Sequence, residues 1–440
     1  MSDLTLPREP AMRSCRRWYV RRGAVAVALP AALLAAAPIA SAAWSSPARV
    51  GSSSVSTLPA PDVAGNAAGR AVVVWADAGR VRAVVRSVAG TWSSAVTISS
   101  ASETSGPPTV AMRPDGTAVA AWSARRATDT VIETAGLLAS GAWSSPAVLS
   151  TAGTTAQATP QVAVDGAGSV QIAWAQSAAA GGTVRWSVQP GGSGWAAPTD
   201  VATGQSAVTS IVLSVNARGD SVVGWATGTS GLPHSGNVAV RHVAGLFSAP
   251  TRLVTSGGRP IQSALGTFAV AIDPAGRATA AWDTAYAYAD SQLADGSWGP
   301  VVTLPSAPYA SYVSLAVNSN ATAVATWVDA NGLESSVRPT GGVWATPTRL
   351  GATAYPQAAL AANGATVFGA WDDLAPSPRP VLGATWTASG SWTSGTILDR
   401  LALPYDSTPP SIAALGSGAI AAWVNAGSSS GAITVSVTTG

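Results

Sequence analysis

One round of a recurring pattern reads Trp143-Ser-Ser-Pro-Ala-Val-Leu-Ser150, then Pro160-Gln-Val-Ala-Val-Asp-Gly166, then Ser169-Val-Gln-Ile-Ala-Trp174. Its short apolar runs are separated by Gly, Pro, Asn and Asp, which is typical of strands joined by turns. Each round supplies four such strands, here named a to d. Strand b ends on one tryptophan and strand d opens on another. The pattern predicts an all-β fold built from repeated four-stranded sheets.

Aromatic residues mark two positions in each round. The position that ends strand b, the first series, holds Trp75, Trp122, Trp174, Trp225, Trp282, Trp327, Trp371 and Trp423. The position that opens strand d, the second series, holds Trp44, Trp92, Trp143, Trp195, Phe247, Trp298, Trp344 and Trp392. Members of the first series lie between 44 and 57 residues apart, a spacing typical of propeller blades. We expect both series to pack between neighbouring blades.

The last round lacks its fourth strand. After Trp423 the chain continues as Ala432-Ile-Thr-Val-Ser-Val-Thr-Thr-Gly440 and stops where strand d begins in the other rounds. The missing piece is Ala43-Trp44-Ser-Ser-Pro-Ala-Arg-Val50. Pairing these two segments would close a ring and remove its open edge. We therefore predict a single eight-bladed β-propeller of four-stranded blades over residues 43–440, with the last blade closed by the mature N-terminal strand.

Residues 1–42 have the features of a signal peptide. A basic region ending at Arg22 precedes an apolar stretch from Gly23 to Pro38, and Ala40-Ser41-Ala42 matches a cleavage site. We expect the mature protein to be secreted to the cell surface or beyond. The general secretory route and the twin-arginine route both stay open, because Arg16-Arg17-Trp-Tyr-Val-Arg21 resembles a twin-arginine motif. No later segment is apolar enough to span a membrane.

The charge of the mature chain argues against nucleic-acid binding. Residues 1–42 hold six of the 24 basic residues and two of the 21 acidic ones, which leaves 18 Arg and 19 Asp or Glu. The net side-chain charge is therefore −1, and the basic pI near 9.3 comes largely from the leader. A basic surface that could attract nucleic acid is not expected. We expect a monomer whose partner is a glycan or another cell-surface ligand.

Few residues in the mature chain could support catalysis. Glutamate occurs only at Glu103, Glu133 and Glu334, histidine only at His234 and His242, and the one cysteine, Cys15, lies in the leader. No His, Asp and Glu cluster has metal-ligand spacing, so we expect neither a metal site nor a cofactor. Acceptor side chains often follow the first-series tryptophan by two positions, where we expect them to cap turns; these are Asp77, Gln176, Asp329, Asp373 and Asn425.

The loops divide into two classes. The a–b and c–d turns are short and rich in Gly, whereas the b–c and d–a loops vary in length and carry most Asp, Arg and Tyr. Variable loops on a rigid scaffold are a common place for function. We predict a ligand site on the b–c and d–a face, contributed by blades five and seven, with these residues: Asp283, Tyr286, Tyr288, Asp372, Asp373 and Arg379. Aromatic rings beside carboxylates and an Arg suit a sugar.

The repeated phrase Gly-x-Trp-Ser-x-Pro, as in Gly141 to Pro146, follows an Asp-Gly turn and an Ala-Trp strand end. This phrase resembles secreted bacterial β-propeller repeats of the sialidase-like and propeller-lectin kind. The resemblance implies either of two functions. The first is a non-catalytic propeller that binds a glycan, a cell-wall component or a protein on its variable-loop face. The second is a sialidase-like glycoside hydrolase or lyase with two carboxylates, for which Asp283, Asp290, Asp372 and Asp373 are the candidates.

Overall fold

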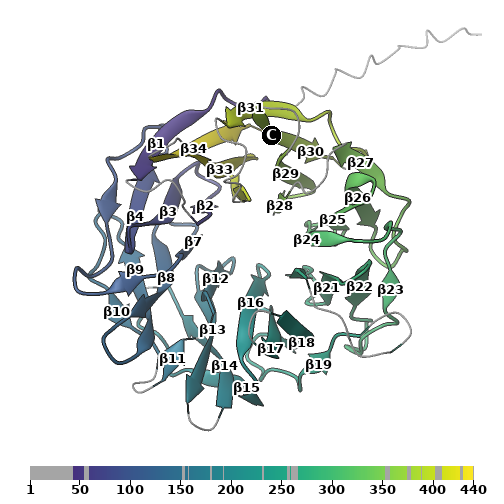
Figure 1. The fold of residues 1–440 in the computed structure, drawn as a ribbon, viewed down its shortest axis with the longest axis horizontal. Coiled ribbons are helices and arrows are strands. Elements are labelled where there is room, and N and C mark those ends of the chain that lie inside the picture. The colour runs from purple at the N-terminus through teal and green to yellow at the C-terminus, as the bar shows by residue number, and fades with distance from the viewer. Residues whose placement is uncertain are drawn as a thin grey trace, which may run out of the picture. The chain divides into compact units, whose positions relative to one another are not determined.

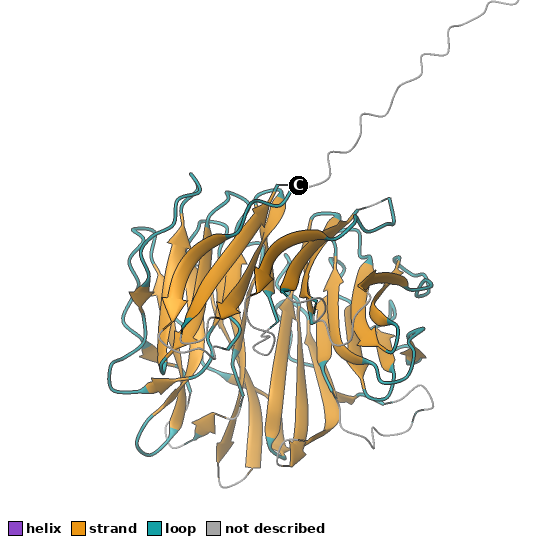
Figure 2. Cartoon of the chain, turned by 45° about the horizontal axis from the view of Figure 1, so that its top comes forward, coloured by secondary structure: helices purple, strands orange, loops and turns teal. Residues whose placement is uncertain are grey.

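The computed structural model divides the chain into Met1–Ala40 and Ser41–Gly440, and the description here concerns the second unit. The structure describes residues 43–53, 59–150, 154–156, 158–178, 181–191, 193–229, 232–254, 258, 266–351, 357–373, 378–387, 389–401, 409–426 and 430–439. The predicted signal peptide lies outside these residues and stays a prediction. Within them, every regular element is a strand (Figure 2).

The strands form eight four-stranded antiparallel blades around a central axis (Figure 1). Blade one holds β2 (Asp62–Gly65), β3 (Ala71–Asp77), β4 (Arg80–Arg86) and β5 (Val96–Thr97). Blade two holds β7 (Thr109–Met112), β8 (Ala118–Arg125), β9 (Thr130–Leu137) and β10 (Ala147–Val148). Blade three holds β12 (Gln161–Val164), β13 (Val170–Ala178), β14 (Gly181–Gln189) and β15 (Thr199–Gln205). Blade four holds β16 (Val208–Val215), β17 (Ser221–Thr229), β18 (Leu232–Arg241) and β19 (Thr251–Arg252).

The second half of the ring repeats this arrangement. Blade five holds β20 (Phe268–Ile272), β21 (Ala278–Asp283), β22 (Ala287–Ser291) and β23 (Val302–Thr303). Blade six holds β24 (Ser311–Val317), β25 (Ala323–Asp329), β26 (Gly332–Arg338) and β27 (Thr348–Gly351). Blade seven holds β28 (Ala358–Asn363), β29 (Thr366–Asp372), β30 (Arg379–Trp386) and β31 (Thr396–Leu401). The short strand β11 (Thr155–Ala156) pairs with both β9 and β13 and joins blades two and three into one sheet, and β6 (Thr104–Ser105) adds to this sheet beside β8.

Blade eight is built from both ends of the chain segment that the structure describes. It holds β32 (Ser411–Leu415), β33 (Gly418–Ala426), β34 (Gly431–Thr438) and the N-terminal β1 (Ala48–Ser53). β1 pairs antiparallel with β34 from Ala48 opposite Val435 to Ser53 opposite Gly431. Figure 1 shows the purple β1 beside the yellow β34. The predicted eight-bladed ring and its closure are therefore confirmed.

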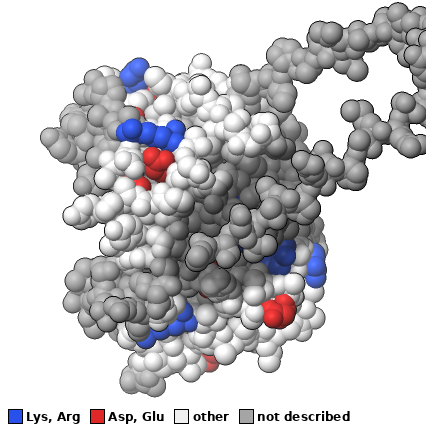
Figure 3. Space-filling view, turned by 90° about the vertical axis from the view of Figure 1, so that its right-hand side faces the viewer, with Lys and Arg blue, Asp and Glu red and all other residues white. Residues whose placement is uncertain are grey.

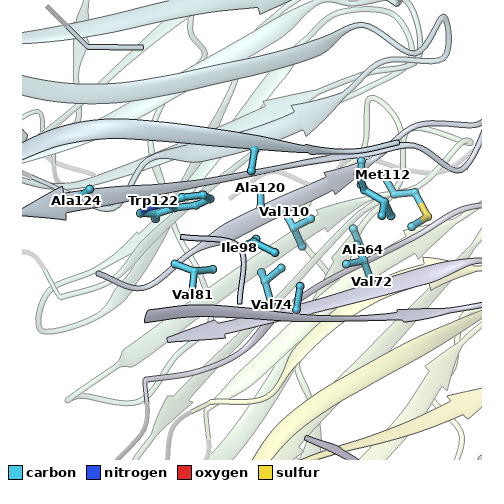
Figure 4. Packing of buried hydrophobic residues seen from close by; sticks show 14 of the residues in the cluster. Ala64, Val72, Val74, Val81, Ile98, Val110, Met112, Ala120, Trp122 and Ala124 are labelled. Carbon is cyan, nitrogen blue, oxygen red and sulfur yellow. The ribbon is translucent and has the colours of Figure 1, made fainter. Parts of the chain in front are cut away.

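The core lies between consecutive blades. Strand b is buried on both faces, as in β3, β21 and β25, where every residue is buried. This explains why its sequence is apolar without alternation. In Figure 4, Val72 and Val74 of blade one face Val110, Ala120 and Trp122 of blade two. The interface between two blades is thus the unit of hydrophobic burial in this fold.

The two aromatic series both pack at blade interfaces, but to different depths. All eight first-series tryptophans are at most 1% exposed. The second-series residues are half-buried. They open strand d, which is the outermost strand of each blade, so the protein covers only one side of each ring. Most of them pair across the c–d turn with the last residue of strand c, as Trp92 does with Arg86. The half-exposed rings therefore border the grooves between blades.

Hydrogen bonds between the a–b turns tie neighbouring blades together near the axis. In four blades an asparagine at the end of strand a donates its Nδ2 to a backbone carbonyl in the next blade. These bonds are Asn66 to Pro114 (3.1 Å), Asn216 to Asp273 (2.9 Å), Asn318 to Ala365 (2.7 Å) and Asn363 to Gly416 (3.1 Å). The Oδ1 atoms of Asn66, Asn216 and Asn318 also accept backbone N–H groups of their own turns, so in three blades one residue fixes both the turn and the blade contact.

Candidate functional site

A groove of about 490 Å³ lies between blades five and six. The a–b turn of blade five, from Asp273 to Arg277, and the c–d turn of blade six, around Gly341, both line it. The groove therefore opens on the face that carries the short turns. Figure 3, which views the side of the ring where these blades lie, shows few charged atoms on a largely uncharged surface. A volume of this size suits a small ligand.

Polar side chains from three strands meet in this groove. Thr279 of β21 and Ser291 of β22 are cross-strand partners, and their hydroxyl oxygens lie 3.0 Å apart. Arg338 of β26 reaches across from blade six and donates from Nη2 to the Thr279 Oγ1 at 3.0 Å. Asp290 Oδ1 accepts a hydrogen bond from the Ser291 backbone N–H at 2.6 Å. The groove thus joins a carboxylate, two hydroxyls and a guanidinium.

The surroundings shift the protonation of these groups. Burial raises the pKa of Asp290 to about 6. The hydrogen bond from the Ser291 N–H and the charge of Arg338 lower this pKa, but they do not cancel the effect of burial. Burial also lowers the pKa of Arg338, and the nearby Arg277 adds to this. Arg277 itself is paired with Asp273, Nη2 to Oδ2 at 2.7 Å. Both Asp290 and Arg338 therefore lie in a partly dehydrated place where contacts to a ligand are strong.

Apolar groups form the outer walls. Leu293 is 50% exposed, Val302 39% and Val343 85%, and other blades expose apolar side chains at or near the corresponding positions, such as Leu138 and Val148. The half-buried second-series Trp344 lies beside them, with the Arg338 Cζ 5.6 Å from its ring centroid. Apolar walls around a few directed polar groups are typical of ligand sites.

Blade five departs from the repeat at the two positions that make this groove polar. The residue three before the first-series Trp is Thr279 in blade five, while the other blades have Val72, Val119, Gln171, Val222, Val324, Phe368 and Ile420. The second position lies on strand c. It is the residue that pairs with the one two before that Trp, and in blade five Asp290 pairs in this way with Ala280. The other blades place there Val84, Ala135, Ser187, Ala239, Ser336, Ala384 and Ser436. A carboxylate at this position is unique to blade five.

From the sequence we named Asp290 as one of the candidate carboxylates of a hydrolase. The structure places it inside β22 among the residues that line the groove, on the opposite side of the strand from Ser291, with its carboxylate turned to the Ser291 N–H at the strand edge. Thr279, Ser291 and Arg338 were not predicted as site residues. Aligning the eight rounds on the first-series tryptophan would have revealed Thr279 and Asp290 as exceptions. Arg338 could not be found that way, because arginine also stands six residues before the second-series aromatic at Arg86 and Arg241.

The predicted site residues of blade five surround the end of β21. Asp283 is 1% exposed and accepts hydrogen bonds from the Thr267 N–H (3.0 Å) and Oγ1 (2.6 Å). Burial raises the pKa of Asp283 to about 6. Tyr288 is buried and stacks on Trp282 with centroids 6.0 Å apart, and Tyr286 is 38% exposed. In this group, only Tyr286 presents a large surface to solvent.

The predicted site residues of blade seven form a second, separate cluster. Asp372 and Arg379 are both 2% exposed and form an ion pair with each other. The Asp372 Oδ1 also accepts the Gln357 N–H at 3.1 Å, and burial raises the pKa of Asp372. Asp373 is half-buried, with its backbone N–H bonded to Pro380. Blade six stands between this cluster and the one around Asp283, so the structure does not bring the two together. Ligand binding by these six residues stays a prediction.

Much of the predicted ligand face falls outside the described residues. These include Arg259, Tyr355, Tyr405 and Asp406, and the side chain of His234. A described groove on that face, of about 380 Å³, lies at Asp399 and Asn425 between blades seven and eight. Three larger grooves open on the opposite, short-turn face: the one between blades five and six, one of about 410 Å³ between blades two and three, and one of about 540 Å³ between blades eight and one.

A second charged cluster lies on the variable-loop face at blade two. Arg126 binds the carboxylates of Glu103 (Nε to Oε1, 2.7 Å) and Glu133 (Nη2 to Oε1, 3.1 Å). Glu133 also accepts the Trp122 indole N–H at 3.2 Å. Burial and a hydrogen bond with Glu103 raise the pKa of Glu133 to about 6. These contacts fasten the d–a loop before blade two to strands β8 and β9.

Within the described part of the chain, no group of three or more His, Cys, Asp and Glu residues is placed to hold a metal ion. The same residues contain no helix long and apolar enough to cross a membrane.

Comparisons with known proteins support the fold. No family model matches the sequence, and no curated protein matches it. Among solved structures, a prolyl endopeptidase is similar with a TM-score of 0.50 and 14% identity over 84% of this chain and 54% of its own. This chain thus spans about half the length of that enzyme. The polysaccharide lyase Uly1 is similar with a TM-score of 0.48 and 9% identity, over 84% and 88% of the chains.

A third similar structure is the α-L-arabinofuranosidase Arb93A from Fusarium graminearum, with a TM-score of 0.43 and 12% identity. The similarity covers 68% of this chain and 98% of that enzyme. The similarity to the prolyl endopeptidase agrees with the propeller fold seen in the structure. Because one fold hosts many functions, these likenesses leave the function to be argued from the site.

Proposed function

We propose that this protein binds carbohydrate non-catalytically in the groove between blades five and six. The observation that carries the proposal is the departure of blade five from the repeat at Thr279 and Asp290. The other blades have apolar residues, Gln or Ser at these positions and none has a carboxylate. The Ser291 N–H satisfies one oxygen of the buried Asp290 carboxylate, and no hydrogen bond to the other oxygen is found among the described residues. We infer that this oxygen accepts from a ligand with many hydroxyl groups.

The chemistry of the groove suits a sugar ring. Asp290 can accept hydrogen bonds from sugar hydroxyls, while Thr279 and Ser291 can both donate and accept them. The apolar walls at Leu293, Val302 and Trp344 can cover the C–H face of the ring. A glycan or cell-wall polymer of the cell surface would meet a secreted protein of this kind, which agrees with the predicted signal peptide.

Binding fits this groove better than hydrolysis or elimination. A glycoside hydrolase needs two carboxyl groups flanking the scissile bond. In this groove Asp273 is held by Arg277, so Asp290 is the one lining carboxylate outside an ion pair among the described residues. We expect no turnover of chromogenic glycosides. Release of a chromophore at a rate above that of the Asp290→Ala variant would instead favour the enzyme hypothesis.

The test is a glycan array followed by titration calorimetry on the best ligand. Asp290→Ser gives blade five the residue of blades three, six and eight, and Thr279→Val gives it the residue of four others. We expect Asp290→Ser to weaken binding at least about tenfold, since a hydrogen bond to a charged group contributes about 1.5–3 kcal/mol. The melting temperature should not fall, because both variants restore the common blade sequence.

The matched control is Asp295→Ala, which removes a nearby exposed carboxylate on the c–d turn that does not line the groove. Its affinity should equal that of the wild type. Unchanged affinity in Asp290→Ser would show that the glycan binds elsewhere, and an array without any bound glycan would refute carbohydrate binding.

A further inference from the structure

The guanidinium of Arg338 carries donor capacity that the protein does not use. Its Nη2 bonds to Thr279, but its Nε is buried and has no hydrogen-bond partner among the described residues. Its neighbours Asp273 and Asp290 stabilise its charge, yet neither forms an ion pair with it within 4.0 Å in the described structure. A buried charged donor left this way is costly unless a partner arrives.

Arginines at the same position in other blades are used differently. Arg86 of blade one donates from Nη1 to the Gly69 carbonyl of its own blade at 2.6 Å. Arg241 of blade four lies over the Trp186 ring, 4.5 Å from its centroid. Only Arg338 among these three bonds to a side chain of the preceding blade, beside a carboxylate that no other blade has. Its guanidinium therefore contacts both Trp344 of its own blade and Thr279 on the groove side of blade five.

The charges of the groove are arranged as two units. Asp273 and Arg277 neutralise each other through contacts of 2.7 and 2.8 Å. Asp290 and Arg338 remain as a separated acceptor and donor. A ligand that fits both must offer hydroxyl donors to Asp290 and an anionic acceptor to Arg338. A carboxylate is the acceptor that the planar guanidinium binds best.

From this arrangement we infer that the preferred ligand is an acidic glycan, in which the carboxylate of a uronic acid binds Arg338 while ring hydroxyls bind Asp290. This inference rests on the proposed carbohydrate site and names its ligand class. A neutral sugar would give Arg338 only hydroxyl partners. Charge-assisted hydrogen bonds are roughly twice as strong as neutral ones. We therefore expect the acidic form of a matching oligosaccharide to bind about tenfold more tightly than its neutral form.

The experiment compares galacturonate, glucuronate and mannuronate oligosaccharides with their own methyl esters, which keep the ring and remove the charge. Calorimetry on the full-length protein should give at least one acid that binds about tenfold more tightly than its ester. Arg338→Gln should abolish this difference, because it removes the cationic partner of the acid and leaves the acid and its ester with similar affinities. Arg338→Lys should keep part of it, and its melting temperature reports on folding.

The matched control is Arg86→Gln, which removes the corresponding arginine from the groove between blades eight and one. It should leave the preference for the acid intact. Loss of the preference in Arg86→Gln, or acids that bind no better than their esters, would overturn the inference and leave carbohydrate binding standing. If neutral glycans bind on the array and no uronate does, the inference fails alone. If no glycan binds at all, the proposed function fails with it.

Discussion

Every blade has a buried tryptophan at the end of strand b, but the residue that accepts its indole N–H differs from blade to blade. The indole N–H of Trp174 donates to Gln176 and that of Trp327 to Asp329, at 2.9 and 3.1 Å. We expected these acceptors, two positions after each tryptophan, to cap turns. Asp329 does both, because its other oxygen accepts the Asn331 N–H. For Trp122 and Trp423 the partner comes from strand c or strand d, as Glu133 and Asp399. The indole N–H groups of Trp75, Trp282 and Trp371 have no partner among the described residues.

The buried carboxyl group of Asp283 should make the unfolding free energy depend on pH. Its pKa is raised from its ordinary value to about 6 by burial, so the folded state holds the proton more tightly than the unfolded state. Its contribution to stability is therefore full at low pH and is lost as pH rises through about 6. Between pH 7 and pH 4 the unfolding free energy of the wild type should rise relative to Asp283→Asn, by up to about 3 kcal/mol.

Urea unfolding of both proteins across this pH range checks the prediction. The comparison with Asp283→Asn isolates one residue, since other carboxyls such as Asp290 titrate equally in both proteins. An unchanged difference between the two proteins from pH 7 to pH 4 would mean that Asp283 keeps an ordinary pKa.

At the scale of the element, the a–b turn is both a local turn and a joint between blades. Asn318 is 2% exposed, and its Oδ1 accepts the backbone N–H groups of Asn320 and Thr322 at 3.0 Å. Its Nδ2 donates to Ala365 of blade seven. Asp165 and Asp273 occupy the same position in blades three and five, where the turn bonds are kept by the carboxylate.

Two substitutions separate these roles. Asn318→Asp keeps the turn acceptor but loses the donor to blade seven, whereas Asn318→Ala loses both. We expect a loss of about 1–2 kcal/mol for Asn318→Asp and a larger loss for Asn318→Ala, because the alanine also leaves buried N–H groups unpaired. Thermal unfolding measures both. Equal losses would show that the turn bonds contribute nothing beyond the joint.

At the scale of the whole molecule, stability depends on closing the ring. β1 pairs with β34, and the Ser436 hydroxyl donates to the Ser45 carbonyl at 2.7 Å. Trp44 packs directly over the backbone of Gly383 in blade seven, where an added Cβ would lie 2.7 Å from the indole. The N-terminal segment therefore completes blade eight and covers its contact with blade seven.

A chain that begins at residue 51 should be less stable than one that begins at residue 43, by on the order of 5 kcal/mol. The missing segment carries the first half of β1, from Ala48 to Val50, and the partly buried Trp44. Because an opened blade exposes the edge of β34, the shorter chain should also self-associate. Calorimetry and light scattering test both effects. Equal melting temperatures would contradict a role for closure.

The sequence alone determined the number of blades, the place of each strand b and the closure of the ring, because all three depend on spacing along the chain. It could not determine the groove, since Thr279, Asp290 and Arg338 are brought together by register within blade five and by the packing of blade six against it. Nor could it distinguish the fully buried tryptophans from the half-exposed ones, because both are apolar and only their distance from the rim differs. Asp283 and Asp372 show the same limit. From the sequence both were expected to bind a ligand, but in the fold both are buried and bonded to other residues of the protein.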